Sequence, residues 1–424
     1  MLLVTTLLAL LFILIGVPVG LSLIGATLIG FFVTSPVQLQ AVVSVAINSV
    51  NDESLVAIPL FVIAGAVIAE SGFMDSLLEI LAWVLRPLRG GLVLAALGTA
   101  LFFAGSTGST AGEAASISSS FFDPMRRRGY SPPLTAAMIC ASAAAGVLLP
   151  PSITLIVYGT IASYPITSLW LAGIVPALIS AVFLGGVGVL LARRSMSTPE
   201  ITKSVKLGGG RSKTYVLVKA FCALGLPVVV LGGIYSGILT VTETAAVSIV
   251  YVLAFGVVFD RLTFRRMYRS FNLGAERAAL IFLVFVGAHV FNYYLTLSGF
   301  LTTLVNDITN SGLPRPILLI LLDIVILLLG SIMDGLSVLI VATPLLFPLL
   351  GFLQLSPVQL GVMLCLAIEI GVVHPPIGLN LYAVSSVTKL PVGKIAISVI
   401  PFVGVLLGML ALVTFAPLPI FAWH

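Results

Sequence analysis

Charged residues are scarce in this sequence of 424 residues: Asp, Glu, Lys and Arg make up 8% of it, against roughly 25% in ordinary soluble proteins. Residues 1–51 and 129–192 contain none of the four. An ionised side chain at the centre of a bilayer costs about 2.5 to 3.5 kcal/mol, so such runs are typical of membrane spans. With 59% apolar residues, the chain is predicted to be an all-α polytopic membrane protein without a soluble catalytic domain.

Cysteine is also scarce, with Cys140, Cys222 and Cys365 standing far apart in apolar segments. This spacing indicates neither a disulfide framework nor a transition-metal site. No Ser-His-Asp or zinc-ligand pattern is present, and the Gly208-Gly209-Gly210 run lacks the strand and helix of a phosphate-binding loop. The sequence therefore predicts no enzyme and no cofactor.

The N-terminal apolar run lacks the basic start and the small-residue cleavage site of a signal peptide. We expect it to stay in the membrane. Residues 1–33 fit either one tilted span or two short segments broken at Gly16-Val17-Pro18.

The few basic residues are grouped, and their positions predict the topology. All 20 Lys and Arg residues except Arg315 fall in five clusters, at 86–89, 126–128, 193–219, 261–277 and 389–394. The positive-inside rule assigns each cluster to the cytoplasm, so the chain between two clusters crosses the membrane an even number of times. The net charge of +5 is thereby explained by topology and anionic lipid rather than by nucleic acid, and the C-terminus is predicted to be periplasmic.

Two segments between these clusters are rich in Gly and Ser at their centres. Residues 90–125 start and end beside cytoplasmic clusters and carry Gly105-Ser106-Thr107 in the middle, which predicts a re-entrant hairpin open to the cytoplasm. Residues 314–349 carry Gly330-Ser331 in the middle and predict a second hairpin that opens the opposite way. The two halves of the chain are therefore predicted to be inverted repeats.

A shift of the sequence against itself by 225 positions supports this repeat. The shift aligns Gly105-Ser106 with Gly330-Ser331, Ser131-Pro132 with Ser356-Pro357, Gly146-Val147 with Gly371-Val372, and Pro150-Pro151 with Pro375-Pro376. The first repeat is predicted at 1–193, with its hairpin at about 90–125 and a broken helix at about 131–164. A basic cytoplasmic linker follows at 194–214, and the second repeat at 215–424 has its hairpin at about 314–349 and its broken helix at about 357–388.

Paired apolar segments that are interrupted by Gly and Pro indicate the binding site of a secondary transporter. Proline lacks an N–H and blocks the preceding helical turn, so each break frees backbone carbonyls. In a membrane these groups must be buried in protein or face a cavity. Carbonyl and hydroxyl oxygens suit a sodium ion, and the N-termini of half-helices favour an anion beside it.

The candidate site residues follow from the two hairpin tips and the two breaks. Sodium ligands are predicted among Gly105, Ser106, Thr107, Ser109, Gly146, Pro150 and Ser152 for one site, and among Gly330, Ser331, Asp334, Gly335, Gly371, His374 and Pro375 for the other. A substrate carboxylate is expected between the tips, near Ser106, Ser331 and Asn380.

Structural roles compete with several of these assignments. Small Ser and Gly residues also permit close helix packing. An intramembrane acid such as Asp334 indicates function, yet it also fits a structural polar pair. His374 fits ion binding, proton exchange or a hydrogen bond to a freed carbonyl, and the roles of Glu113, Asp323 and Glu369 stay open.

These motifs resemble those of the large membrane subunit of tripartite ATP-independent periplasmic (TRAP) transporters, in the ion-transporter superfamily. The similarity covers essentially the whole chain, except that His374 stands where many members have threonine. The stretches that carry it are Gly105-Ser106-Thr107 through Ala111, Pro124-Met125 with Gly129-Tyr130, Pro150-Pro151-Ser152-Ile153, and Pro375-Pro376-Ile377-Gly378-Leu379-Asn380.

The resemblance implies a sodium-driven, elevator-type importer in a bacterial or archaeal cytoplasmic membrane, whose hairpins and broken helices slide against a scaffold. It implies a small four-helix membrane subunit on a separate chain, and a periplasmic binding protein that delivers a small organic acid such as a carboxylate. Two alternatives stay open: a stand-alone ion-coupled carboxylate symporter or antiporter of the same superfamily, and a membrane assembly subunit that transports nothing. The sequence does not identify the acid, the sodium stoichiometry or the oligomeric state.

Overall fold

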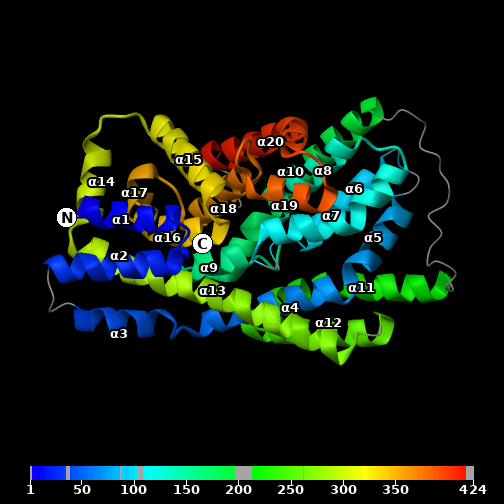
Figure 1. Cartoon of the computed structure of the whole chain (residues 1–424), viewed down its shortest axis with the longest axis horizontal. Helices are drawn as coiled ribbons and strands as arrows, with labels where there is room; N and C mark the ends of the chain where they lie inside the picture. Colours follow the sequence, from blue (N-terminus) through cyan, green and yellow to red (C-terminus); the bar gives the residue numbers. More distant parts are fainter. Residues whose placement is uncertain are drawn as a thin grey trace.

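The computed structural model describes residues 2–34, 39–85, 88, 90–103, 105, 108–195, 213–260 and 262–416. All regular elements in these residues are helices (Figure 1). In the first half of the chain they are α1 (Leu2–Leu14), α2 (Val19–Thr34), α3 (Leu39–Ser49), α4 (Ala57–Glu70), α5 (Phe73–Val84), α6 (Gly91–Phe103), α7 (Thr110–Arg127), α8 (Pro132–Gly146), α9 (Ile153–Ile161) and α10 (Ile166–Ser195). In the second half they are α11 (Lys213–Tyr235), α12 (Val241–Asp260), α13 (Phe264–Leu297), α14 (Phe300–Asn310), α15 (Arg315–Ile332), α16 (Gly335–Leu346), α17 (Leu350–Leu353), α18 (Pro357–Val373), α19 (Leu379–Thr388) and α20 (Val392–Phe415).

Membrane-spanning length is common among these helices. Within the described residues, 7 helices are long and apolar enough to cross a bilayer. The predicted class, an all-α polytopic membrane protein, is confirmed. The inverted relation of the two halves stays a prediction.

The N-terminal apolar run forms two helices rather than one tilted span. α1 ends at Leu14 and α2 begins at Val19, which places the break at the predicted Gly16-Val17-Pro18. Gly16 has a φ of +91°, a left-handed conformation that glycine adopts without steric penalty.

The two predicted breaks interrupt otherwise regular helices. α8 stops at Gly146 and α9 starts at Ile153, while α18 stops at Val373 and α19 starts at Leu379. The peptide bonds Pro150-Pro151 and Pro375-Pro376, one in each break, are cis. Neither proline pair can donate backbone hydrogen bonds, so the helix cannot continue through it.

The centre of the molecule is formed by the first halves of the broken helices. Every residue from Thr135 to Gly146 in α8 and from Val358 to Val373 in α18 is buried. Apart from Gln359 and Glu369 in α18, both helices are apolar or small on all sides, as expected of helices that are surrounded by protein. They contact each other, and α15 and α16 pack on α18 while α6 and α7 pack on α8.

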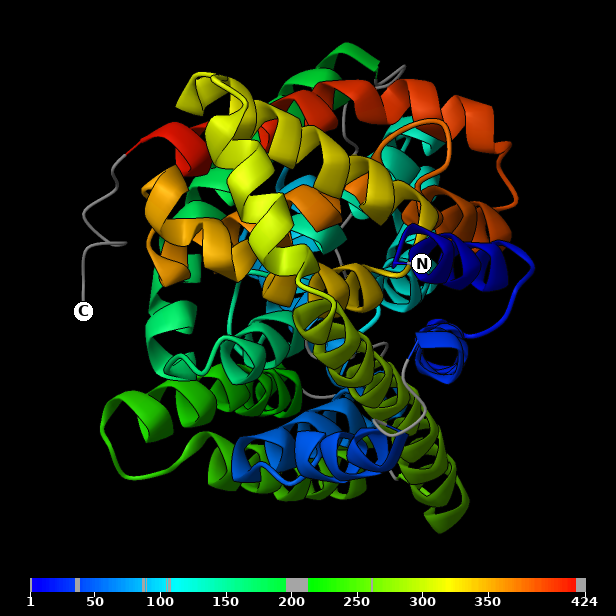
Figure 2. The same ribbon diagram turned by 90° about the vertical axis from the view of Figure 1, so that its left-hand side faces the viewer.

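Two groups of helices flank this centre. In Figure 1, α3, α4, α11 and α12 lie on one side of the molecule, and α10 and α20 lie on the other. Figure 2 shows the same helices turned by 90°. The 34-residue helix α13 contacts α3 and α4 in the first group, and it also contacts α2 and, beside the centre, α16. α13 therefore joins the flanking helices to the predicted hairpin segments.

Candidate functional site

The tip between α6 and α7 is attached to the first helix break by backbone hydrogen bonds. The Ile153 N–H, at the start of α9, donates to the Gly105 carbonyl over 3.0 Å. The Gly105 N–H in turn donates to the carboxyl group of Glu113, with both oxygens at 3.1 Å. Sequence reasoning left Glu113 open between the cavity and hairpin packing, and the structure gives it this contact inside the tip.

Gly105 fits this position because it has no side chain. Its φ is +91°. A Cβ atom there would lie 3.3 Å from the carbonyl oxygens of Val147 and Pro151. The close approach brings the tip and the break together, as the sequence predicts for the first group of candidate ligands.

Two serines that were predicted as sodium ligands cap half-helices. The Ser109 hydroxyl accepts a hydrogen bond from the Gly112 N–H over 3.3 Å at the start of α7. The Ser152 hydroxyl accepts one from the Leu155 N–H over 3.2 Å at the start of α9. Each serine satisfies an N–H group that the first helical turn leaves without an intrahelical partner.

The tip between α15 and α16 lies against α18. The Ser331 hydroxyl is placed to donate to the Gly371 carbonyl at 3.1 Å and to the Leu327 carbonyl at 3.0 Å. A Cβ atom on Gly330 would stand 2.7 Å from the Ile368 carbonyl oxygen, so the two helices touch through their backbones. Gly330, Ser331 and Gly371 of the second predicted site are thus brought together.

A small cavity of about 10 Å³ separates the two tips. Three acids from both halves of the chain line it: Glu113, Asp334 and Glu369. Glu369 is 4% exposed, and its Oε2 has no hydrogen-bond partner. The other residues that line the small cavity are Gly105, Gly108, Ser109, Thr110, Val147, Thr154, Gly335 and Leu336. A buried carboxylate oxygen and nearby hydroxyls are suitable ligands for a small hard cation.

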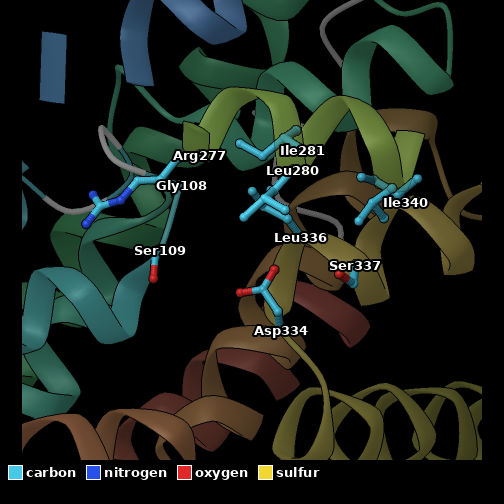
Figure 3. A pocket seen from close by; sticks show the side chains of 10 residues that line it. Gly108, Ser109, Arg277, Leu280, Ile281, Asp334, Leu336, Ser337 and Ile340 are labelled. Atoms are coloured by element: carbon cyan, nitrogen blue, oxygen red, sulfur yellow. The ribbon is translucent and has the colours of Figure 1, made fainter. Parts of the chain in front are cut away.

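A larger cavity of about 310 Å³ adjoins the same tips (Figure 3). Asp334, exposed at the start of α16, lies on one side of it, while Gly108, Ser109 and Arg277 lie on the other. The remaining lining residues are Leu280, Ile281, Val284, Leu336, Ser337 and Ile340. Its mostly apolar wall with a few polar groups is typical of a small-molecule site, and its volume is at the lower end of the range for one.

The remaining predicted residues that the structure describes do not line either cavity. Asn380 is fully buried, its amide atoms have no hydrogen-bond partner, and its backbone carbonyl accepts a hydrogen bond from the Cys140 thiol over 3.5 Å. His374 and Pro375 form the second break without lining either cavity, and Gly146 and Pro150 occupy the corresponding places in the first. Ser106 and Thr107 lie outside the described residues.

The sequence did not mark two of the polar residues that line these cavities. Thr154 lies in the first helical turn after the first break, where its hydroxyl is indistinguishable from that of an ordinary helix residue. Arg277 ends a basic cluster that we interpreted only as a topology signal. The available clue to a site role for Arg277 was its position directly before the charge-free stretch 278–306.

Comparison with known proteins identifies the family of this architecture. The family of DctM components of tripartite ATP-independent periplasmic transporters matches residues 6–418. The chain is 31% identical over 418 residues to the C4-dicarboxylate TRAP transporter large permease protein DctM of Rhodobacter capsulatus, which covers 95% of this chain and 94% of that protein. It is 29% identical over 405 residues to the sialic acid TRAP transporter large permease protein SiaM of Vibrio cholerae, with coverages of 95% and 93%.

A longer relative and a solved structure extend the comparison. The isethionate TRAP transporter permease protein DctMQ of Oleidesulfovibrio alaskensis is 30% identical over 415 residues, which are 97% of this chain but 64% of that protein. The crystal structure of the YdaH transporter of Alcanivorax borkumensis has a TM-score of 0.66 and 15% identity, and covers 97% of this chain and 98% of its own. At this identity the solved structure shows a shared fold alone.

Proposed function

The chain belongs to the family of DctM components of tripartite ATP-independent periplasmic transporters, and we propose that it carries a small organic acid across the membrane by sodium-coupled elevator transport. The family relation makes it the large membrane subunit of a multi-pass transporter, and not an enzyme. Its relatives are named for isethionate, C4-dicarboxylates and sialic acid, all of which are anions at neutral pH. The substrate class is therefore a small organic acid.

The observation that carries the sodium proposal is the convergence of three acids on one small cavity. Glu113 comes from α7, Asp334 precedes α16 and Glu369 belongs to α18, so both halves of the chain contribute. An uncompensated carboxylate inside a membrane protein is costly, and a bound cation offsets that cost. A sodium ion supported by these acids and by nearby backbone carbonyls would hold the two tips together.

The elevator proposal has a physical basis in the packing of the helices. α7 contacts α19, α9 contacts α16, and α15 contacts α18, so the two tips and the two broken helices form one packed group. In the proposed movement this group slides as a unit against a scaffold that contains α2, α4 and α11 to α13. Ion and substrate binding would stabilise the group for the crossing.

Two partners complete the proposed importer: a small membrane subunit and a soluble periplasmic binding protein. The combined DctMQ name of one relative supports the first of these. Both partners are proposed here to be separate chains.

The test is uptake into proteoliposomes that contain the large and small subunits, with the binding protein outside. We expect uptake of an organic acid to require an inward sodium gradient, and Asp334→Asn to abolish that dependence. Asp323→Asn is the matched control, because Asp323 accepts a hydrogen bond from Thr414 over 2.9 Å and lines neither tip cavity. Undiminished uptake without the gradient would contradict sodium coupling.

The same preparation separates the alternatives. A stand-alone symporter would take up the acid without the binding protein. A membrane subunit that transports nothing would show no uptake, and the biological role of its complex would survive both Ser106→Leu and Asp334→Leu.

A further inference from the structure

Arg277 is a positive charge at the large cavity without a negative partner among the described residues. It is half-buried on α13 and lines the 310 Å³ cavity together with Ser109 and Asp334. In the described part of the chain, it makes no ion pair and no side-chain hydrogen bond. Since a partly buried charge is stabilised by a counter-charge, this guanidinium is suited to a ligand that brings one.

The surroundings of the guanidinium favour an anion. A Cβ atom on Gly112 would lie 4.0 Å from Nη2 of Arg277, so the group stands over the first turn of α7. The N-terminal end of a helix carries a partial positive charge and attracts anions. Figure 3 shows Arg277 on the Gly108 and Ser109 side of the cavity. The nearest acid on α7, Glu113, directs its carboxyl group to the Gly105 N–H instead.

Opposite charges stand on opposite sides of this cavity. Asp334 lies across it from Arg277 and also lines the small cavity between the tips. A cation beside Asp334 and an anion beside Arg277 would therefore be held apart in one space, each next to the protein charge of opposite sign. Apolar residues such as Ile281 and Leu336 line the rest of the wall and suit the carbon skeleton of a small acid.

We propose that Arg277 binds the carboxylate or sulfonate group of the transported acid at the cytoplasmic end of this cavity, an assignment that rests on the proposed function. A guanidinium forms two parallel hydrogen bonds with either group, and lysine forms only a point contact. Arg277 ends the basic cluster 261–277, which the positive-inside rule assigns to the cytoplasm. Arg277 then contacts the substrate as it leaves the cavity toward the cytoplasm.

The experiment measures binding from the cytoplasmic side. Proteoliposomes with the large and small subunits and the external binding protein take up succinate, N-acetylneuraminate or isethionate, whichever the wild type accepts. The same anion is then loaded inside at increasing concentration, and the concentration that halves uptake is determined. Loss of a bond between charged groups predicts that Arg277→Gln raises this concentration by about 10- to 100-fold, with a smaller rise for Arg277→Lys.

Arg269→Gln is the matched control, because Arg269 is an exposed residue of the same helix outside the cavity. If Arg277→Gln does not fold, Arg277→Lys carries the test. A half-inhibiting concentration that equals the wild-type value in the folded Arg277 variants would overturn the role of Arg277 and leave the proposed function intact. Absence of uptake of all three anions by the wild type would overturn both.

Discussion

The tip between α6 and α7 and the tip between α15 and α16 lie against broken helices, but different contacts hold them. At the first, a carboxyl group accepts the Gly105 N–H, and the Gly105 carbonyl accepts the Ile153 N–H. At the second, Gly330 touches the α18 backbone and the Ser331 hydroxyl bonds to the Gly371 carbonyl. The first tip depends on a hydrogen bond to an ionisable carboxyl group, and the second depends on the absence of a side chain at Gly330.

This difference bears on how each tip can respond to an ion. Glu113 accepts a hydrogen bond from the backbone of its own tip and also lines the small cavity. The backbone of the first tip is thereby linked to the charge of a group in that cavity. The second tip is held by close packing, and its acid, Asp334, is exposed at a cavity instead. We expect the stability of the first tip to be sensitive to the replacement of polar residues, and that of the second tip to substitutions that add volume.

The largest effect is expected from Gly330→Ala and Gly371→Ala. The new methyl groups would meet backbone atoms of Ile368 and Leu327, which cannot move aside as a flexible side chain can. Overpacking of this kind typically destabilises by about 1–3 kcal/mol, and we expect the upper end because backbone has to shift. The thermal unfolding midpoint and the yield of monodisperse protein in detergent would report it. Gly404→Ala is the control, since nothing lies within 4 Å of its Cβ position; equal midpoints for all three variants would refute the packing argument.

An intermediate effect is expected from Glu113→Ala, which removes the acceptor of the Gly105 N–H. A hydrogen bond to a charged group contributes about 1.5–3 kcal/mol, and Glu113→Gln should retain part of it. Amide hydrogen exchange of a peptide that includes Gly105 should become faster in the alanine variant, and peptides from α15 and α16 should not change. Faster exchange at the second tip instead would mean that the two tips are not held independently.

The smallest effect is expected from Ser331→Ala. A bond between a neutral hydroxyl and a carbonyl contributes about 1 kcal/mol, and the Gly330 packing remains in place. Uptake and the unfolding midpoint should both stay closer to wild type than in Glu113→Ala. If Ser331→Ala is the more damaging of the two, the second tip relies on polar contacts after all, and the contrast between the tips is wrong.

Much of the fold could be predicted because its signals are local. Pro150-Pro151 separates α8 from α9, and Pro375-Pro376 separates α18 from α19, because a proline pair ends a helix in any surroundings. In the same way, Gly16-Val17-Pro18 separates α1 from α2. The contacts of the candidate site were harder to predict. Asn380 was expected beside the tips and is fully buried without lining either cavity, while Arg277 was interpreted as a topology anchor and lines the large cavity.

The sequence by itself determined the membrane class, the positions of the helix breaks and the grouping of the charges, because composition and proline chemistry act along the chain. Only the tertiary structure decided that Glu113 holds Gly105, that Asp334 and Glu369 border one cavity, and that Arg277 lies across from Asp334. The physical reason lies in helices such as α8 and α18, which are buried on all sides. Their sequences have no polar face that would tell which neighbour each residue meets.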